Sequence, residues 1–376
     1  MIRLILIIIA FLVSLLAIFR AFTFHMWILA IGVTEFPWLF AGITILLLAS
    51  GYWFTKYQLS GTVIGIIALL LFLSPIFRAY LVSGKIDKQF DSAFGTKTTD
   101  DRSPFSFFRM FKRNDTVAYK KIAYVKYSDT SLNLDYYPAT KQTTKRPCVI
   151  VVHGGSWSGG DSQQLPELNN YLALKHYNIA SIDYRMAPKW QTPAPVEDIV
   201  NALKYLREHA DELHIDTNQF ILLGRSAGAQ IALLAAYTLH DKSIKGVIDF
   251  YGPADMVWGY SIPSNPLIMD SRKVMGQYIG GTYQQVPQKY HDCSPLEFVG
   301  KDSPPTLIIH GQNDVLVSPE HSHRLNAKLQ KFGIKHYYLK LPWATHGFDY
   351  NLNGPGGQLS TYTVERFLKT ISPPAP

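Results

Sequence analysis

The chain has 376 residues, of which 47% are hydrophobic, and a formal net charge of +8 at pH 7, which is compatible with one large domain and a smaller region. Its lysines and arginines are scattered, and no basic motif contains base-stacking aromatics, so nucleic acid is not an expected partner. Its two cysteines, Cys148 and Cys293, are too few for a disulfide framework or a metal-thiolate cluster.

The first 83 residues are far more apolar than the rest of the chain. Three uncharged apolar runs cover residues 4–19, 36–55 and 57–77. The later two are each long enough to cross a bilayer as a helix of about 20 residues. The first is shorter, but apolar sequence resumes after Arg20 and continues to Val33, which allows a tilted or extended span. No small-residue cleavage pattern follows Phe19, which argues against a cleaved signal peptide.

We therefore predict that residues 1–83 form a transmembrane region of about three helices, and that the lipid bilayer is a partner of this multi-pass chain. The alternative is a buried helical core, which would need a large soluble domain around these runs. A small excess of basic residues on one side favours a cytoplasmic location for the rest of the chain. The flanking residues concerned are Arg3, Arg20, Lys56, Arg78, Lys85, Lys88 and Lys97.

Residues 84–116 are polar and are predicted to be a linker or an interfacial segment. Within them, residues 104–113 (PFSFFRMFKR) mix phenylalanine with basic residues. This mixture is expected where a chain leaves a membrane along an anionic surface. It is equally typical of an ordinary helix packed on the following domain.

Residues 117–376 alternate short β-rich runs with helical patterns, which predicts an α/β fold with a mostly parallel sheet covered on both faces. The expected strands are residues 120–127, 132–137, 148–152, 179–184, 220–223, 246–251, 306–310 and 336–341. The expected helices are residues 165–176, 195–209, 227–239, 319–332 and 359–370. Residues 253–291 interrupt this order, and we predict that they form a cap-like insertion over a substrate.

A G-x-S-x-G motif, residues 224–228, follows one expected strand and directly precedes a helix-forming run. A sharp turn from strand to helix strains the serine backbone and exposes its hydroxyl, which makes Ser226 the candidate nucleophile. The motif alone is common, so its context decides the interpretation.

An earlier expected strand ends in a second glycine-containing motif, His153-Gly154-Gly155-Ser156-Trp157. Its glycine N–H groups, together with that of Ala227, can donate hydrogen bonds to the oxyanion of an acyl-transfer intermediate. His153 is expected to brace this loop rather than to transfer protons.

A serine hydroxyl needs a histidine base and a carboxylate that orients the histidine, both further along the chain. His346 follows the last expected strand and satisfies the order serine, acid, histidine. Asp314 directly follows the preceding strand and is preferred over Asp255, whose other role would be to cap a loop. The three histidines interpreted as structural are His310, His321 and His323.

The sequence predicts no metal and no cofactor. The histidines and carboxylates lack HExxH-like spacing, and neither the GxxxxGK[ST] nor the GxGxxG phosphate-binding pattern occurs.

Five stretches of the chain resemble the hormone-sensitive-lipase-like esterases of the α/β-hydrolase superfamily, over roughly residues 117–370. They are HGGSW at 153–157, DYRMAP at 183–188, GRSAGA at 224–229, HGQND at 310–314 and THGF at 345–348. The resemblance implies an α/β-hydrolase fold, a triad and an oxyanion hole. The implied residues are Ser226, Asp314 and His346 for the triad, and Gly154, Gly155 and Ala227 for the hole.

The chain departs from the commonest pattern of this family at two places. Arg225 precedes the serine where an acidic residue is usual, and Gly228-Ala229 stands where two glycines are usual. The stretch SAGAQIA is more similar to the membrane-associated prenylcysteine methylesterase branch, and arylformamidases share much of the pattern. Arg225 would either attract an anionic substrate group or form a salt bridge with a neighbouring loop.

These observations predict a membrane-anchored serine hydrolase that cleaves a small, lipophilic carboxylic ester through an acyl-enzyme intermediate. One alternative is an amide or peptide hydrolase of the arylformamidase or prolyl-oligopeptidase type. Another is a non-catalytic membrane scaffold with a hydrolase-like domain, although the presence of all three triad residues argues against it. The oligomeric state stays open.

Overall fold

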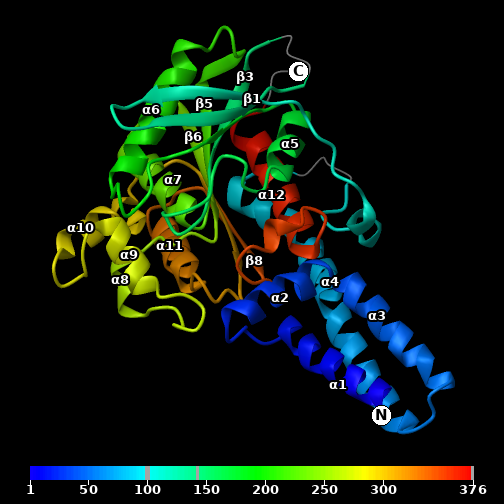
Figure 1. Ribbon diagram of the computed structural model, residues 1–376. Helices are drawn as coiled ribbons and strands as arrows, with labels where there is room; N and C mark the ends of the chain where they lie inside the picture. The colour runs from blue at the N-terminus through cyan, green and yellow to red at the C-terminus, as the bar shows by residue number, and fades with distance from the viewer. Residues whose placement is uncertain (98–101, 141–143, 374–376) are drawn as a thin grey trace.

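The computed structural model describes residues 1–97, 102–140 and 144–373 (Figure 1). Its centre is an eight-stranded sheet with the order β1-β2-β4-β3-β5-β6-β7-β8. The strands are β1 (Lys120–Lys126), β2 (Ser131–Tyr137), β3 (Arg146–Val152), β4 (Asn178–Ile182), β5 (Ile215–Arg225), β6 (Ile244–Phe250), β7 (Thr306–Gly311) and β8 (His336–Leu341). Strand β2 pairs antiparallel with β1 and β4, and the remaining pairs are parallel, so the predicted mostly parallel sheet is confirmed.

Helices cover both faces of this sheet, because its central strands are apolar on both sides. In β3 the side chains of Cys148, Ile150 and Val152 belong to one core cluster, and Val149 and Val151 belong to the other. The first cluster includes residues from α6 (Ala194–Glu208), α7 (Ala227–Thr238) and α11 (Glu320–Lys331). The second includes residues from α5 (Glu167–Leu174), α12 (Pro355–Ile371) and the long N-terminal helix α4.

The predicted insertion between β6 and β7 folds into short helices. They are α8 (Met256–Ser261), α9 (Ser271–Ile279), α10 (Pro287–Asp292) and the 3-10 helix η4 (Pro295–Phe298). Figure 1 shows α8, α9 and α10 grouped on one side of the sheet.

The N-terminal region consists of α1 (Ile2–Ser14), η1 (Leu15–Ala17), α2 (Phe24–Glu35), α3 (Pro37–Ala49), η2 (Ser50–Tyr52) and α4 (Gln58–Phe94). Helices α1 and α3 and the first half of α4 project away from the sheet domain (Figure 1). By length and composition α4 is able to cross a membrane, and α2 with α3, bent by 86°, would be a second span if the pair acts as one. The predicted three spans are therefore not confirmed.

The extended first span expected across Arg20 does not form. The helical structure of the first run ends at Ala17, and a new helix starts at Phe24. Thr23 caps this new helix, since its hydroxyl accepts a hydrogen bond from the N–H of Met26 at 3.3 Å. Arg20 instead donates to the backbone oxygen of Gln312 at 3.0 Å, which holds the intervening segment on the sheet domain.

The boundary expected at residue 83 also differs from the structure, because α4 continues without a break to Phe94. Its last turns pack on the sheet domain, where the Phe90 ring lies 5.6 Å from that of Tyr337. Arg366 of α12 forms ion pairs with Asp87 and Asp91 of α4. A glycine such as Gly84 costs a helix only about 1 kcal/mol, and these contacts explain why the helix passes through it. Residues 98–101 of the expected linker lie outside the described residues.

Residues 104–113 contain a short 3-10 helix, η3 (Phe107–Phe111). Phe105 and Met110 are buried, whereas Phe108 is 80% exposed. The segment thus packs on its neighbours, as one of the two interpretations expected, and still presents one aromatic side chain to the surroundings.

Helix α2 is joined to the sheet domain by a buried carboxylate, Glu35. Its side chain accepts a hydrogen bond from the N–H of Gly356 in the first turn of α12, at 2.8 Å. Its backbone oxygen accepts another from the amide of Asn351, also at 2.8 Å. A carboxylate at a helix N-terminus is favoured by the helix dipole, so Glu35 ties the N-terminal region to α12.

Candidate active site

The G-x-S-x-G motif forms the sharp turn that the sequence predicts between β5 and α7. Ser226 has φ 52° and ψ −119°, a strained conformation for a residue with a side chain. A Cβ on Gly224 would lie 2.3 Å from the oxygen of Gly228, and a Cβ on Gly228 would lie 2.2 Å from that of Val152. Both glycines are therefore required for the turn to close.

The three residues expected to form a triad lie together at the carboxyl ends of the parallel strands. Ser226 follows β5, Asp314 follows β7 and His346 follows β8. The Nε2 atom of His346 lies 3.0 Å from the Oγ of Ser226, and its Nδ1 lies 2.7 Å from the Oδ2 of Asp314. With the ring proton assigned to Nδ1, the serine hydroxyl donates to Nε2 and Nδ1–H donates to the carboxylate.

Four donors surround the carboxylate of Asp314. Its Oδ1 accepts from the N–H groups of Leu316 and Val317 at 2.9 and 3.0 Å. Its Oδ2 contacts both His346 and the Nε2 of His310, the latter at 3.2 Å. Burial alone would raise the pKa of Asp314, but the charges and hydrogen bonds of the two histidines outweigh it and lower the pKa. The group is thus an ionised acceptor at neutral pH.

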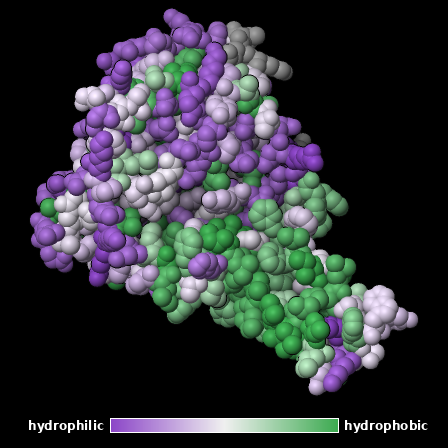
Figure 2. All heavy atoms as spheres, in the orientation of Figure 1, coloured by the Kyte–Doolittle hydropathy of each residue, from purple (hydrophilic) through white to green (hydrophobic). Residues whose placement is uncertain are grey.

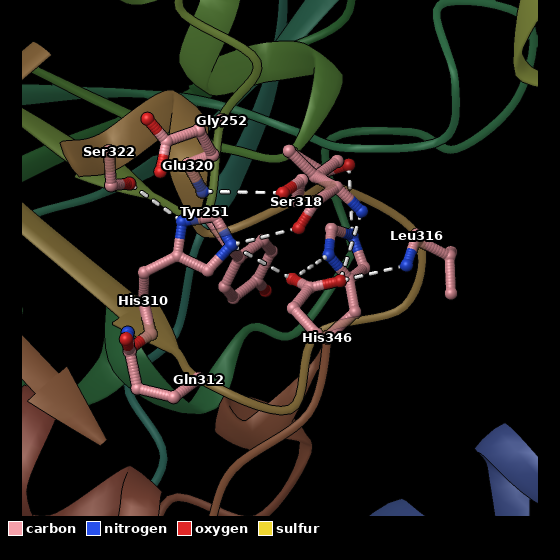
Figure 3. A network of polar contacts seen from close by, with 12 residues as sticks. Tyr251, Gly252, His310, Gln312, Leu316, Ser318, Glu320, Ser322 and His346 are labelled. Carbon is pink, nitrogen blue, oxygen red and sulfur yellow. Dashed lines mark hydrogen bonds and ion pairs between the residues drawn. The ribbon is translucent and has the colours of Figure 1, made fainter. Parts of the chain in front are cut away.

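His310, which the sequence presents as structural, contacts Asp314 directly. Figure 3 shows the ring of His310 joined to Ser322 by a dashed line. Its Nδ1 lies 2.6 Å from the hydroxyl of Ser322, and its Nε2 lies 3.1 Å from the oxygen of Val317. A ring that carries a proton on Nε2 and accepts at Nδ1 satisfies all these contacts. In the sequence only the short distance of four residues between His310 and Asp314 pointed to this contact.

The loop after β3 lies against the nucleophile turn. The N–H of Gly154 is already engaged, since it donates to the Oε1 of Gln164 at 2.7 Å. The N–H groups of Gly155 and Ala227 have no acceptor within the described part of the chain. A side chain at position 154 would be crowded, because an added Cβ would lie 3.1 Å from the oxygen of Arg225. Of the three expected oxyanion donors, two are therefore available in this arrangement.

Two aromatic contacts fix the shape of this loop. The ring of His153 stacks on that of Tyr184 with a centroid distance of 4.3 Å, and its Nδ1 lies 2.7 Å from the oxygen of Gly154. Burial lowers the pKa of His153, which favours the neutral ring. Trp157 stacks on Tyr278 at 4.6 Å and belongs to the larger core. His153 thus braces the loop, as expected.

Arg225 lies beneath the nucleophile turn and not in the substrate pocket. Its side chain is 2% exposed, and its Nε donates to the Oδ2 of Asp349 at 2.6 Å. The other carboxylate oxygen of Asp349 accepts from the hydroxyl of Tyr251. The predicted salt bridge is confirmed, and this buried guanidinium is not positioned to attract an anionic substrate group.

The rival acid and the remaining histidines lie elsewhere. Asp255 caps α8 by accepting from the N–H of Trp258 at 2.9 Å, and it pairs with Arg324 at 2.9 Å. The Nδ1 of His321 accepts from the N–H of Asp255 at 3.2 Å, and His323 lies 3.3 Å from the carboxylate of Glu320. The capping role considered for Asp255 accounts for its contacts.

A second buried carboxylate, Asp249 on β6, was not among the residues that the sequence analysis singled out. Its Oδ1 accepts from the N–H of Gly252 at 2.7 Å, and its Oδ2 has no partner among the described residues. Burial, only partly offset by that hydrogen bond and by the charge of His310, raises the pKa of Asp249 to about 7.

Asp249→Asn is expected to make the protein more stable than wild type at pH 8, with an advantage that shrinks below pH 7. The pKa in the folded state lies above the unfolded value of about 3.9, so the folded protein retains a proton that the unfolded chain releases. Stability from this group is present at low pH and is lost as the pH rises through about 7. Melting temperatures of the variant and wild type between pH 4 and 8 measure the difference. Asp302→Asn, at an exposed site, is the control, and an equal difference at every pH would contradict the assignment.

Ser226 lies at the wall of a pocket of about 370 Å³. Ser226, Ala227 and Ser156 line it on the side of the sheet, and residues of the insertion and of the N-terminal region line the rest. These lining residues include Arg20, Ala21, Phe22, Ile262, Ile268 and Met275. The contribution of the N-terminal region to this pocket is not apparent from the sequence.

Helix α2 also contacts the loop of His346. The indole Nε1 of Trp27 donates to the backbone oxygen of His346 at 3.0 Å, and the two rings lie 6.4 Å apart. Trp27 is separated from His346 by 319 residues along the chain, so no local pattern indicates this contact.

Trp27→Phe is expected to lower kcat for a short aryl ester about 3- to 10-fold with little change in KM, because a net hydrogen bond contributes about 0.5–1.5 kcal/mol. The phenyl ring retains most of the packing but leaves the His346 oxygen without its donor. Steady-state kinetics of the purified variant test this. Trp53→Phe, at the exposed far end of the N-terminal helices, is the control and should leave both constants unchanged. A rise in KM alone would show that Trp27 does not position His346.

Among the residues that the structure describes, no group of three or more His, Cys, Asp or Glu side chains is arranged to hold a metal ion.

A mostly parallel sheet with a serine on a strained turn between β5 and α7 defines the α/β-hydrolase class. Residues 134–329, more than half of the chain, match the family model described as BD-FAE, and the chain belongs to this family. The resemblance to hormone-sensitive-lipase-like esterases that the motifs indicate is confirmed at the level of the family.

Curated relatives carry names from the same superfamily. The chain is 29% identical over 259 residues to "Esterase LipC" of Mycobacterium tuberculosis, which covers 65% of this chain and 63% of the relative. It is 26% identical over 237 residues to "Isoprenylcysteine alpha-carbonyl methylesterase ICME" of Arabidopsis thaliana, covering 58% of this chain and 55% of the relative. The chain thus spans less than two thirds of the length of these relatives.

Solved structures show the same fold at low sequence identity. A truncated carbohydrate esterase from gut microbiota has a TM-score of 0.57 and 23% identity, with 68% of this chain and 97% of that chain covered. Esterase 2 of Thermogutta terrifontis, phosphonylated by sarin, has a TM-score of 0.58 and 21% identity, with 70% and 98% covered.

Proposed function

We propose that the chain is a serine hydrolase that cleaves carboxylic esters, with Ser226 as nucleophile, His346 as base and Asp314 as the residue that orients the base. The observation that carries this proposal is the pair of contacts that joins the three side chains, at 3.0 and 2.7 Å. The esterase names of several relatives support it.

In the first step His346 Nε2 accepts the hydroxyl proton of Ser226 while Oγ attacks the ester carbonyl carbon. The carbonyl oxygen becomes an oxyanion, and the N–H groups of Gly155 and Ala227 donate to it. Asp314 stabilises the imidazolium through Nδ1–H. The intermediate then collapses, the bond to the alcohol oxygen breaks, and His346 returns its proton to the departing alcohol.

In the second step a water molecule attacks the acyl group on Ser226. His346 accepts a proton from this water, and the same two N–H groups stabilise the second oxyanion. The bond between Oγ and the acyl carbon breaks, the proton returns to Oγ, and the carboxylic acid leaves. The lowered pKa of Asp314 keeps its charge opposite the ring throughout.

A fluorophosphonate probe tests whether the nucleophile is active. Labelling of the full-length protein in detergent, with Ser226 as the modified residue, is the expected result, and an unlabelled protein would favour a non-catalytic scaffold. An aryl ester and an aryl amide of the same acyl group are then compared as substrates of the unlabelled enzyme. Faster turnover of the amide would favour the arylformamidase or peptidase alternative.

We also propose that the N-terminal region attaches the enzyme to a membrane. The part of α4 from Gln58 to Arg78 contains about 20 residues, and about 30 Å of helix matches the hydrocarbon core of a bilayer. Large exposed apolar side chains such as Leu59, Leu70 and Phe77 lie along it. Basic residues concentrated after this stretch favour the cytoplasmic side for the sheet domain. Retention of the protein in carbonate-washed membranes is expected, and its release by carbonate would contradict membrane insertion.

A further inference from the structure

The segment that follows η1 and includes the first residue of α2, residues 18–24, borders the pocket of Ser226 and is here called the link. It is held by the loop after β7 at one end and by the insertion at the other. Its hydrogen bonds are Arg20 Nη2 to Gln312 O at 3.0 Å, Asn313 Nδ2 to Ile18 O at 3.2 Å, Asn265 Nδ2 to Phe22 O at 3.2 Å and Phe24 N to Leu267 O at 3.1 Å. These bonds hold the backbone of the link beside the pocket, which Arg20, Ala21 and Phe22 line.

The link and the insertion form two sides of the same pocket. Phe22 of the link and Ile262 of the insertion both line the pocket that contains Ser226. The inner lining is largely apolar and includes Ile268, Val274 and Met275, as expected for a site that receives a hydrocarbon group.

The rim of this pocket is unusually apolar. Of the residues that line the pocket, Phe22 and Ile262 are exposed, and in the adjoining parts of the link and the insertion Ile18, Phe19, Phe24 and Leu267 are exposed as well. Exposed apolar patches of this kind mark surfaces that meet a membrane, a partner or a ligand. In Figure 2 hydrophobic residues cover the projecting helices and continue onto the adjoining face of the sheet domain.

This continuous apolar surface indicates that the rim of the pocket contacts the bilayer. Exposed apolar residues of α1 and α2, such as Leu12 and Ile28, belong to the same N-terminal region whose helices are proposed to enter the bilayer. The link connects these two helices. A protein partner would have to cover the membrane helices as well as the rim, whereas a bilayer covers both at once.

The size of the pocket constrains the substrate. A volume of about 370 Å³ is near the lower end of the range for small-molecule sites. An ester with a long hydrocarbon chain would not be contained by it, so part of the chain has to continue past the rim. At the rim that chain would meet apolar side chains, and beyond them the bilayer.

We propose that the substrate is an ester resident in the bilayer, whose long hydrocarbon chain passes between the link and the insertion while its carbonyl group reaches Ser226. The proposal rests on the ester hydrolase function proposed above and names the substrate class of that site. The hydrocarbon chain remains in apolar surroundings throughout, so the substrate reaches the serine without dissolving in water.

The test uses full-length enzyme reconstituted in phosphatidylcholine vesicles. Hydrolysis of 4-methylumbelliferyl oleate embedded in the same vesicles is compared with that of soluble 4-methylumbelliferyl acetate. The variants Phe22→Glu and Ile262→Glu place a charge in the apolar path and are expected to lower the ratio of oleate to acetate turnover at least about tenfold. The control Val200→Glu alters an exposed apolar residue on α6 and should leave the ratio unchanged.

The ratio does not depend on the amount of active enzyme, so partial misfolding of a variant does not obscure it. If the charged variants do not fold, Phe22→Ala and Ile262→Ala are expected to shift the ratio in the same direction. An unchanged ratio in these variants, or a wild-type enzyme that hydrolyses acetate but not embedded oleate, would overturn the access route. Retention of acetate turnover by Ser226→Ala would instead overturn the proposed catalytic function.

Discussion

Replacement of Ser226 by alanine is expected to lower kcat/KM for a short aryl ester by at least about 10⁴-fold. The variant loses the oxygen that attacks the carbonyl and the hydroxyl that contacts His346 at 3.0 Å. Turnover that remains would come from substrate binding and from the N–H groups of Gly155 and Ala227. Initial rates with the purified protein in detergent measure the effect.

Ser261→Ala is the matched control for this prediction. Ser261 is exposed on α8, and its hydroxyl donates only to the oxygen of Trp258. This variant should retain full activity, and both variants should keep the melting temperature of wild type. Undiminished hydrolysis by Ser226→Ala would rule out the acyl-enzyme mechanism.

Arg225→Met is expected to lower the free energy of unfolding by about 3–5 kcal/mol, because it leaves the buried carboxylate of Asp349 without its positive partner. Both side chains of the pair are almost fully buried, and the Nε to Oδ2 contact is 2.6 Å. Since Arg225 directly precedes Ser226, activity should also fall. Chemical denaturation followed by tryptophan fluorescence gives the stability.

The double variant Arg225→Met, Asp349→Leu should regain most of the lost stability, since replacing both members of a buried pair by apolar groups removes the unpaired charge. Lys189→Met provides the comparison with an exposed pair, in which Lys189 lies 3.1 Å from Asp129, and it should change stability little. A loss as large for Lys189→Met as for Arg225→Met would contradict the role given to burial.

The sequence predicted the sheet domain well because its signals are local. The buried strand β3 is an uninterrupted apolar run, and the glycines of the G-x-S-x-G motif are required by the close approach of backbone atoms at Gly224 and Gly228. The order of Ser226, Asp314 and His346 along the chain also follows from the order of the strands that carry them. The structure brings these three side chains together.

What the sequence did not reveal depends on contacts between distant parts of the chain. Gln164 occupies the N–H of Gly154, Trp27 donates to the loop of His346, and Glu35 caps α12. The apolar N-terminal residues were predicted to be membrane spans, because hydropathy measures how apolar a segment is and not what it packs against. The same limit explains why α4 was expected to end near residue 83, although its polar last turns are held by the sheet domain.

Helix α4 is unbroken over 37 residues, from Gln58 to Phe94, and this has a mechanical consequence. One continuous helix begins among the projecting helices and ends packed against β8 and α12. A change in the tilt of the projecting helices therefore changes the orientation of the sheet domain. The orientation of the sheet domain relative to the projecting helices is thus set by this helix and not by a flexible linker. Removal of residues 1–83 would leave less than the last third of this helix, and it would also remove Arg20, Ala21 and Phe22 from the lining of the pocket.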